Sequence, residues 1–137
     1  MKDDLYKTIE RFEPQMVSLL SGLIGIPAIS PLGGGAGEYR KAAYIAESLE
    51  KMGFGKPEVY NAADPAAEEG VRPNLIFRIP GKTSRRLWIV SHIDVVPEGD
   101  RGLWDTDPFK AVVRDRRIYG RGSNDNCQEL VSSLYAV

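Results

Sequence analysis

One stretch of the sequence places an imidazole beside a carboxylate. Residues 90–99, VSHIDVVPEG, contain the single histidine of the chain, His92, and Asp94 follows two positions later. In an extended strand, residues i and i+2 point to the same side, so the two side chains can lie together. A metal-bound histidine commonly donates its second ring N–H to a carboxylate, which fixes the tautomer. The pair is therefore a candidate metal ligand with its orienting acid, although a His-x-Asp pair taken alone fits a structural histidine at a strand edge better.

A second stretch supplies a separate carboxylate. Residues 119–126, YGRGSNDN, carry two glycines, which permit close backbone approach, and then Asp125 at or near the first turn of an expected helix. Backbone N–H groups at that position favour a negative charge, so Asp125 taken alone could be a plain helix cap. Together, His92 and Asp125 offer one imidazole and one carboxylate from two loops. This is ligand chemistry for Zn²⁺ or a similar cation.

Hydrophobic periodicity predicts the elements that would position these residues. Apolar residues recur every three or four positions over 4–21, which predicts an amphipathic helix that contains Pro14. The other expected elements are a helix over 38–52, strands over 58–60, 74–79 and 87–92, a hairpin over 111–120 that turns at Asp115-Arg116, and a helix over 126–137. Helices that alternate with apolar strands favour an α/β fold with a partly parallel sheet. His92 would then lie at the carboxyl end of a strand, where open α/β sheets bind their ligands.

Composition excludes several classes of function. The chain has 137 residues, the length of one domain, with 42% hydrophobic and 27% charged residues. A formal charge of −1 gives no basic excess for nucleic acid or an anionic membrane. The longest apolar run is too short and interrupted for a membrane span, which needs about 20 residues. One cysteine rules out an internal disulfide and fits a reducing compartment, so we expect a cytoplasmic protein.

Several motifs, taken in order, resemble a known family. SHIDVVPEGD, LWDTDPF and IYGRGSNDN follow one another, and LLSGLIGIPAISP precedes them. They resemble the di-zinc amidohydrolase and exopeptidase family of acetylornithine deacetylase, succinyl-diaminopimelate desuccinylase and glutamate carboxypeptidase. The resemblance spans nearly the whole chain. It implies an α/β fold in which helices pack on a mixed sheet, with residues 1–137 as the N-terminal portion of an incomplete zinc-exopeptidase-like catalytic domain.

The same resemblance implies roles for the candidate residues. His92 would bind one metal of a two-metal site, Asp125 would bridge both metals, and Asp94 would be the catalytic-site acid that orients His92. The metals would be two divalent ions, zinc first, with cobalt or manganese as alternatives. The Asp125–Asn126 peptide would be cis. Relatives often have Asp-Gly at the hairpin turn, where this chain has Asp115-Arg116.

The resemblance also implies a reaction, which is hydrolysis of an amide bond in an N-acyl amino acid or a small peptide, by an enzyme whose full-length form is a homodimer. In the family, the general-base glutamate and the remaining metal ligands lie downstream of such a segment. We therefore expect the 137-residue chain to be inactive alone and to bind no metal, or one metal weakly.

Three other interpretations compete with this one. Cys127 lies near a helix start, where a thiolate is favoured, and His92 could be its base, as in a cysteine hydrolase. Nothing near Cys127 builds an oxyanion hole. A non-catalytic relative could use the region for binding. The third interpretation is a nucleotide-binding module, suggested by the glycine-rich GGGAG and by the GKTS at 81–84. These stretches do not have the spacing of a phosphate loop.

Overall fold

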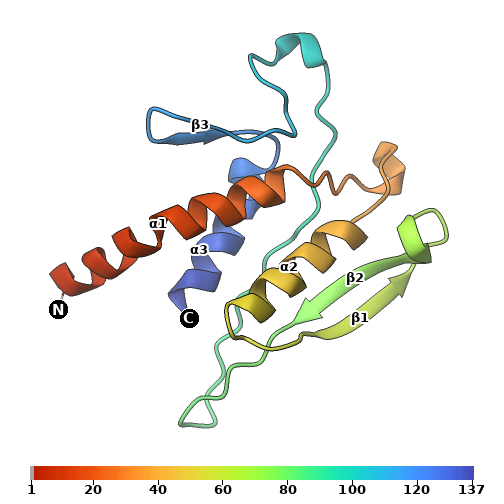
Figure 1. The fold of residues 1–137 in the computed structure, drawn as a ribbon. Helices are drawn as coiled ribbons and strands as arrows, with labels where there is room; N and C mark the ends of the chain where they lie inside the picture. The colour runs from red at the N-terminus through yellow and green to blue at the C-terminus, as the bar shows by residue number, and fades with distance from the viewer. Residues whose placement is uncertain (1) are drawn as a thin grey trace.

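The computed structural model describes residues 2–137. Three helices, two β-hairpins and several short helical turns follow one another along this part of the chain (Figure 1). The regular elements are α1 (Lys2–Ile24), α2 (Tyr39–Lys51), β1 (Glu58–Ala63), β2 (Val71–Ile76), β3 (Val112–Arg114), β4 (Arg117–Tyr119) and α3 (Gln128–Ala136).

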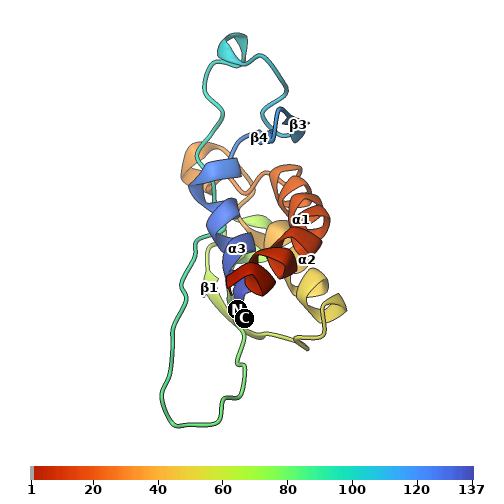
Figure 2. The same cartoon turned by 90° about the vertical axis from the view of Figure 1, so that its left-hand side faces the viewer.

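The three helices enclose the core. The helix predicted for 4–21 is confirmed, and α1 continues through Pro14 as one helix to Ile24. Its second half supplies the buried side chains, while its first half is largely exposed. At the middle of α1, the ring of Phe12 lies 5.5 Å from the ring of Tyr135, and α1 and α3 lie side by side (Figure 2). The core cluster consists of Leu19, Leu20, Leu23, Ile24, Ile45, Leu49, Cys127 and Val131.

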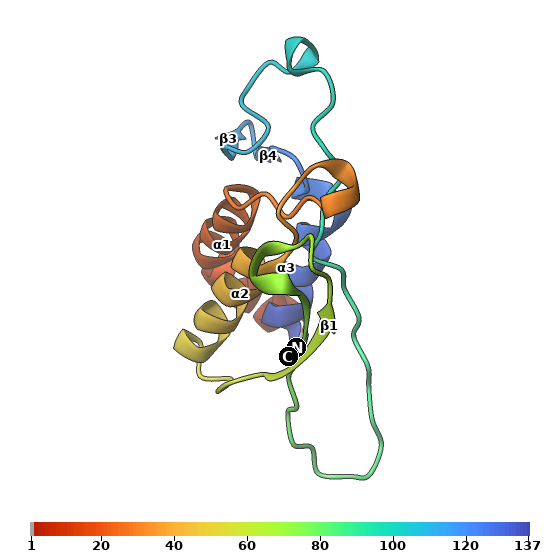
Figure 3. The same ribbon diagram turned by 90° about the vertical axis from the view of Figure 1, so that its right-hand side faces the viewer.

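The α/β class is confirmed, but the two sheets that the structure describes are two-stranded and antiparallel, not the partly parallel sheet that the sequence predicts. β1 and β2 pair antiparallel, with Glu58 opposite Ile76, and this hairpin packs against α2 (Figure 3). β3 and β4 form the second antiparallel hairpin. A parallel bridge joins Ile29 to Val95. That bridge ties the loop after α1 to the segment that carries the histidine.

The hairpin turn lies where the sequence predicts it. Asp115 and Arg116 have φ values of 52° and 59°, so both residues adopt left-handed backbone conformations. Two-residue hairpin turns of this kind usually contain Asn-Gly or Asp-Gly, because glycine tolerates a positive φ. Arg116 therefore occupies a position that glycine prefers.

The predicted strand over 87–92 is wrong for the residues that the structure describes. The segment has no regular strand structure, and Leu87 and Val90 are 84% and 80% exposed. Figures 2 and 3 show the chain after β2 as an extended loop that leaves the helices and returns to them. A strand needs a neighbour to accept and donate its backbone hydrogen bonds, and no described strand pairs with this segment. Its apolar composition predicts a strand, but pairing is not a local property.

The final helix begins slightly later than predicted. A π-helical turn, Ser123–Cys127, precedes α3, which starts at Gln128. Over residues 2–137, no helix is long and apolar enough to cross a membrane.

The core cluster predicts the effect of a truncation. Leu23 is 0% exposed, so Leu23→Ala should leave a cavity and lower the free energy of unfolding by about 3 kcal/mol, measured by urea denaturation. Leu32 is 100% exposed, so Leu32→Ala should change the free energy of unfolding by less than about 0.5 kcal/mol. Equal effects of the two variants would contradict this core.

Candidate metal centre

Two anchored segments carry the candidate ligands. Val95 is buried, its N–H donates to the Ala28 carbonyl at 3.0 Å, and it therefore fixes the segment that holds His92 and Asp94. On the other side, the Cys127 N–H donates to the Gly122 carbonyl at 3.0 Å and closes the turn around Asp125. Gly122 makes this turn with φ at 81°, in the left-handed region.

The structure brings all three predicted site residues together. His92 Nε2 lies 2.9 Å from Asp125 Oδ1, across 33 residues of sequence. His92 Nδ1 lies 3.1 Å from Asp94 Oδ1 and 3.1 Å from the Asp94 carbonyl oxygen. The imidazole therefore stands between two carboxylates, with one ring nitrogen facing each. The Asp125–Asn126 peptide is cis, as the resemblance predicts.

The surroundings of His92 favour its charged form in the metal-free chain. Burial lowers the pKa of His92, but the hydrogen bond to Asp125, the hydrogen bond to the Asp94 backbone and the charges of both carboxylates outweigh that effect and raise the pKa above its ordinary value. In the neutral imidazole, an Nδ1–H that donates to Asp94 leaves the Nε2 lone pair directed at Asp125. That is the tautomer a metal ligand needs.

The donor atoms fit a small divalent cation. Nε2 of His92 and Oδ1 of Asp125 are 2.9 Å apart. Two ligand atoms on one tetrahedral Zn²⁺, each about 2.0–2.1 Å from the ion, are about 3.3 Å apart, so a small movement would accommodate an ion. Within the described part of the chain, no group of three or more His, Cys, Asp or Glu side chains could hold a metal. The chain thus offers an incomplete ligand set, because a catalytic zinc site uses about three protein ligands.

A pocket of about 300 Å³ opens at these residues. Its lining residues come from the histidine segment and from the turn before α3: His92, Asp94, Val95, Val96, Gly120, Arg121, Gly122, Asn124 and Asp125. Arg121 is one of these lining residues and contacts Trp104 and the Glu98 backbone. Its guanidinium lies 5.1 Å from the centre of the Trp104 ring and donates to the Glu98 carbonyl at 3.4 Å.

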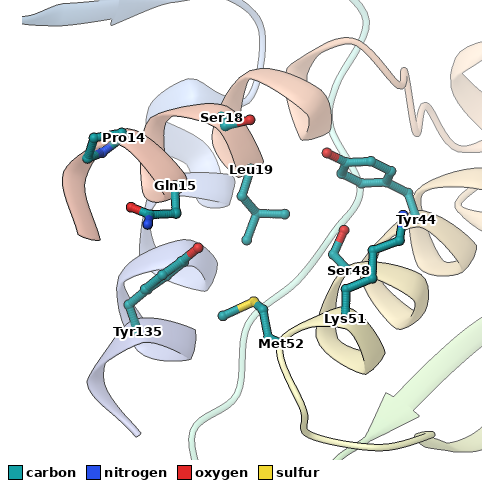
Figure 4. A pocket seen from close by; sticks show the side chains of 9 residues that line it. All are labelled: Pro14, Gln15, Ser18, Leu19, Tyr44, Ser48, Lys51, Met52 and Tyr135. Atoms are coloured by element: carbon teal, nitrogen blue, oxygen red, sulfur yellow. The ribbon is translucent and has the colours of Figure 1, made fainter. Parts of the chain in front are cut away.

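A larger hollow of about 520 Å³ lies elsewhere, between the three helices (Figure 4). Figure 4 shows Tyr44 and Lys51 of α2 across from Leu19 of α1 and Tyr135 of α3. Its lining contains no His, Asp, Glu or Cys. The smaller pocket is therefore the candidate metal site, because its lining contains metal-ligating side chains and that of the larger hollow does not.

The thiol proposed for a cysteine hydrolase is buried. Cys127 is 1% exposed and belongs to the core cluster. Burial raises the pKa of the Cys127 thiol, and the nearby charge of Lys41 offsets this only in part. A reactive cysteine needs a lowered pKa and access to substrate, so this environment disfavours the cysteine interpretation.

The turn around Asp125 predicts the effect of a glycine substitution. A Cβ at Gly122 would lie 2.7 Å from Val95 Cγ1, whereas one at Gly34 would meet nothing within 4 Å. Both glycines have φ near 80°, at 81° and 83°. Gly122→Ala should therefore lower the free energy of unfolding by about 1 kcal/mol or more beyond the effect of Gly34→Ala, measured by urea denaturation. Only Gly122→Ala should shift the NMR signals of the His92 ring; identical spectra would contradict the packing of Gly122 against Val95.

The chain resembles known proteins over both parts of this site. Residues 88–137 match the family model described as Peptidase family M20/M25/M40. The chain is 43% identical over 141 residues to an uncharacterised metallohydrolase of Methanococcus maripaludis, covering 98% of this chain and 31% of that protein. It is 36% identical over 110 residues to a succinyl-diaminopimelate desuccinylase of Rickettsia felis, covering 80% of this chain and 26% of that protein.

A solved structure shares the fold. The di-peptidase Dug1p from Saccharomyces cerevisiae matches with a TM-score of 0.79 and 27% identity, over 95% of this chain and 29% of that one. The chain therefore spans less than a third of the length of these relatives. The family resemblance predicted from the motifs is confirmed: residues 88–137 match peptidase family M20/M25/M40, and most of the chain is similar to proteins named metallohydrolase, succinyl-diaminopimelate desuccinylase and di-peptidase.

Proposed function

We propose that this chain is part of a metal-dependent hydrolase of the deacylase or di-peptidase type and supplies one histidine and one bridging carboxylate to its metal centre. The observation that carries the proposal is the 2.9 Å approach of His92 Nε2 to Asp125 Oδ1. Relatives named metallohydrolase, succinyl-diaminopimelate desuccinylase and di-peptidase support the same class of reaction.

Residues 1–137 form, in this proposal, the N-terminal portion of the catalytic domain. The chain spans 31% and 26% of the lengths of two relatives. His92 and Asp125 would be two of the ligands that the centre needs. The other ligands and the general base would come from further polypeptide. The 137-residue chain alone would then be inactive and bind at most one metal, weakly.

Each residue has a distinct role in the proposed reaction. Asp94 accepts the Nδ1–H of His92 and fixes the ring so that Nε2 faces the metal position. The Asp125 side chain is 84% exposed, so its carboxylate would be accessible to bound divalent cations. Bound divalent cations, zinc first and cobalt or manganese as alternatives, supply Lewis-acid chemistry that polarises the scissile carbonyl and makes a water molecule more acidic.

The substrate and the assembly are also proposals. Desuccinylases and di-peptidases among the relatives support an N-acyl amino acid or a small peptide as substrate. A homodimer of the full-length protein, the absence of nucleic-acid and membrane partners, and a cytoplasmic location stay predictions from the sequence.

A chimaera tests the reaction. This chain would replace the matching segment of the Methanococcus maripaludis relative. The alignment of the two includes 98% of this chain. The chimaera should hydrolyse N-acyl amino acids or dipeptides, lose this activity on treatment with a chelator and regain it with Zn²⁺. His92→Gln and Asp125→Asn should each lower kcat/KM at least about 100-fold, because each removes a metal ligand.

The control is Asp115→Asn, which alters an exposed acid in the β3–β4 turn and should leave kcat/KM unchanged. A chimaera that binds zinc but hydrolyses neither substrate would favour the non-catalytic interpretation. Metal-dependent turnover by the 137-residue chain alone would contradict the proposed division of the site.

Alkylation tests the cysteine alternative. Because the Cys127 side chain is buried in the core, iodoacetamide should modify it slowly in the native chain and rapidly in urea, as measured by mass spectrometry. Cys127→Ser in the chimaera should retain hydrolysis. Fast native labelling together with loss of activity in Cys127→Ser would instead support a cysteine hydrolase.

A further inference from the structure

The β3–β4 hairpin places two arginines directly opposite each other. Arg114 of β3 pairs with Arg117 of β4 in the antiparallel register. The Cβ atoms of residues paired in this way are about 4.5–5.5 Å apart, and like charges at such a position destabilise a hairpin. The pairing therefore concentrates positive charge on this hairpin, although the whole chain has a formal charge of −1.

A tyrosine completes the same face of the hairpin. Ile118 packs against the core cluster, so its neighbours Arg117 and Tyr119 point to the other side of the strand. The Arg114 guanidinium lies 5.1 Å from the centre of the Tyr119 ring, so both strands contribute to this outer face. Hydrogen bonding to the Arg117 and Arg114 guanidiniums lowers the pKa of the Tyr119 hydroxyl below its ordinary value. We call Arg114, Arg117 and Tyr119 the arginine clamp.

The described chain gives the clamp little compensating negative charge. The Asp115 carboxylate lies 3.8 Å from Arg114 Nε and is 83% exposed, and so long and exposed an ion pair is weak. Arg117 has no ion pair with a carboxylate among residues 2–137. By contrast, Arg72 and Arg78 each donate to a glutamate carboxylate. The clamp therefore keeps N–H donors and positive charge that the described chain does not use.

The fold does not require this charge. Arg114 and Arg117 are exposed and contribute nothing to the core cluster. Arg116, beside the clamp, has a φ of 59°, a left-handed conformation that glycine adopts at lower cost. Repulsion between the paired arginines and the conformation of Arg116 both lower the stability of the hairpin. A bound anion would offset the repulsion.

We propose that the arginine clamp is a binding site for a compact oxyanion of the phosphate type. Each guanidinium presents a planar fork of N–H donors that matches phosphate oxygens, and the phenol hydroxyl adds one more donor. Two fixed positive charges match a dianion. Because the three groups share one small face, a compact tetrahedral anion fits them better than an extended dicarboxylate. This site uses no residue of the metal centre, so the inference is independent of the proposed function.

Titration with inorganic phosphate tests the site. Phosphate is added to the ¹⁵N-labelled 137-residue chain with EDTA present, at constant ionic strength and at a pH where phosphate is a dianion. Metal binding and salt screening then contribute nothing to the signal. The backbone and arginine side-chain signals of β3 and β4 should shift and reach saturation. Methyl phosphate in a parallel titration separates the two sources of this group: tighter binding of the ester assigns the clamp to a phosphate ester, and tighter binding of the free ion assigns it to phosphate itself.

Two variants one residue apart separate the clamp from general positive charge. Arg117→Gln removes one fork of the clamp and should weaken phosphate binding at least about tenfold, because charge-assisted hydrogen bonds are lost. Arg116→Gln removes the same charge from the turn and should weaken binding less than about threefold. Asp115→Asn removes the competing carboxylate and should tighten binding by up to about fivefold. Equal losses in Arg117→Gln and Arg116→Gln would overturn the proposal.

Further outcomes also decide against the site. Shifts that rise without saturation, or that chloride reproduces, would show charge screening and no binding site. A short polyglutamate peptide that shifts the same signals and binds more tightly than phosphate would assign the clamp to an acidic polypeptide instead. Arg114→Lys keeps the charge but loses the fork, so it should weaken binding several-fold and repeats the test if Arg117→Gln does not fold.

Discussion

The position of one imidazole between two carboxylates is the interaction on which the site depends. Asp94 fixes His92 from one ring nitrogen, and Asp125 meets the other at 2.9 Å. A neutral histidine has one donor and one acceptor nitrogen, so an acid at Nδ1 decides which atom is available for a cation. The remaining structure mainly holds together two segments that lie 33 residues apart in the sequence, so that these side chains meet.

The helical core holds these two segments in place. Cys127, two residues after Asp125, packs among the α1 side chains, and Val95, one residue after Asp94, is held by the loop that leaves α1. Both acids are therefore attached to the same helix through short connections. Close packing tolerates little displacement of side chains. A side chain at position 122 would press on Val95 and so change the geometry of the pocket.

Local patterns in the sequence predict much of this arrangement. Periodicity identifies the helices, and the Asp115-Arg116 turn identifies the hairpin. Residue types single out His92, Asp94 and Asp125, which the structure brings together. The segment over 87–92 is mispredicted because a strand depends on a distant partner, which composition does not report. The burial of Lys41 is not predicted either, because a lysine side chain is normally exposed. Its position among the buried residues of α2 places it in the interior.

The unpaired segment before His92 has an energetic consequence. Residues 79–92 make no backbone-to-backbone hydrogen bond within the described chain, so the histidine is tethered firmly on its carboxyl side alone. Fixing the backbone of one residue costs about 1–2 kcal/mol of conformational entropy. Any interaction that orders His92 must offset this cost. Any polypeptide that adds a strand along Leu87 to Val90 would remove the cost in advance. In the proposed metal centre, pairing of this segment with another strand and binding of the cation would therefore be thermodynamically coupled.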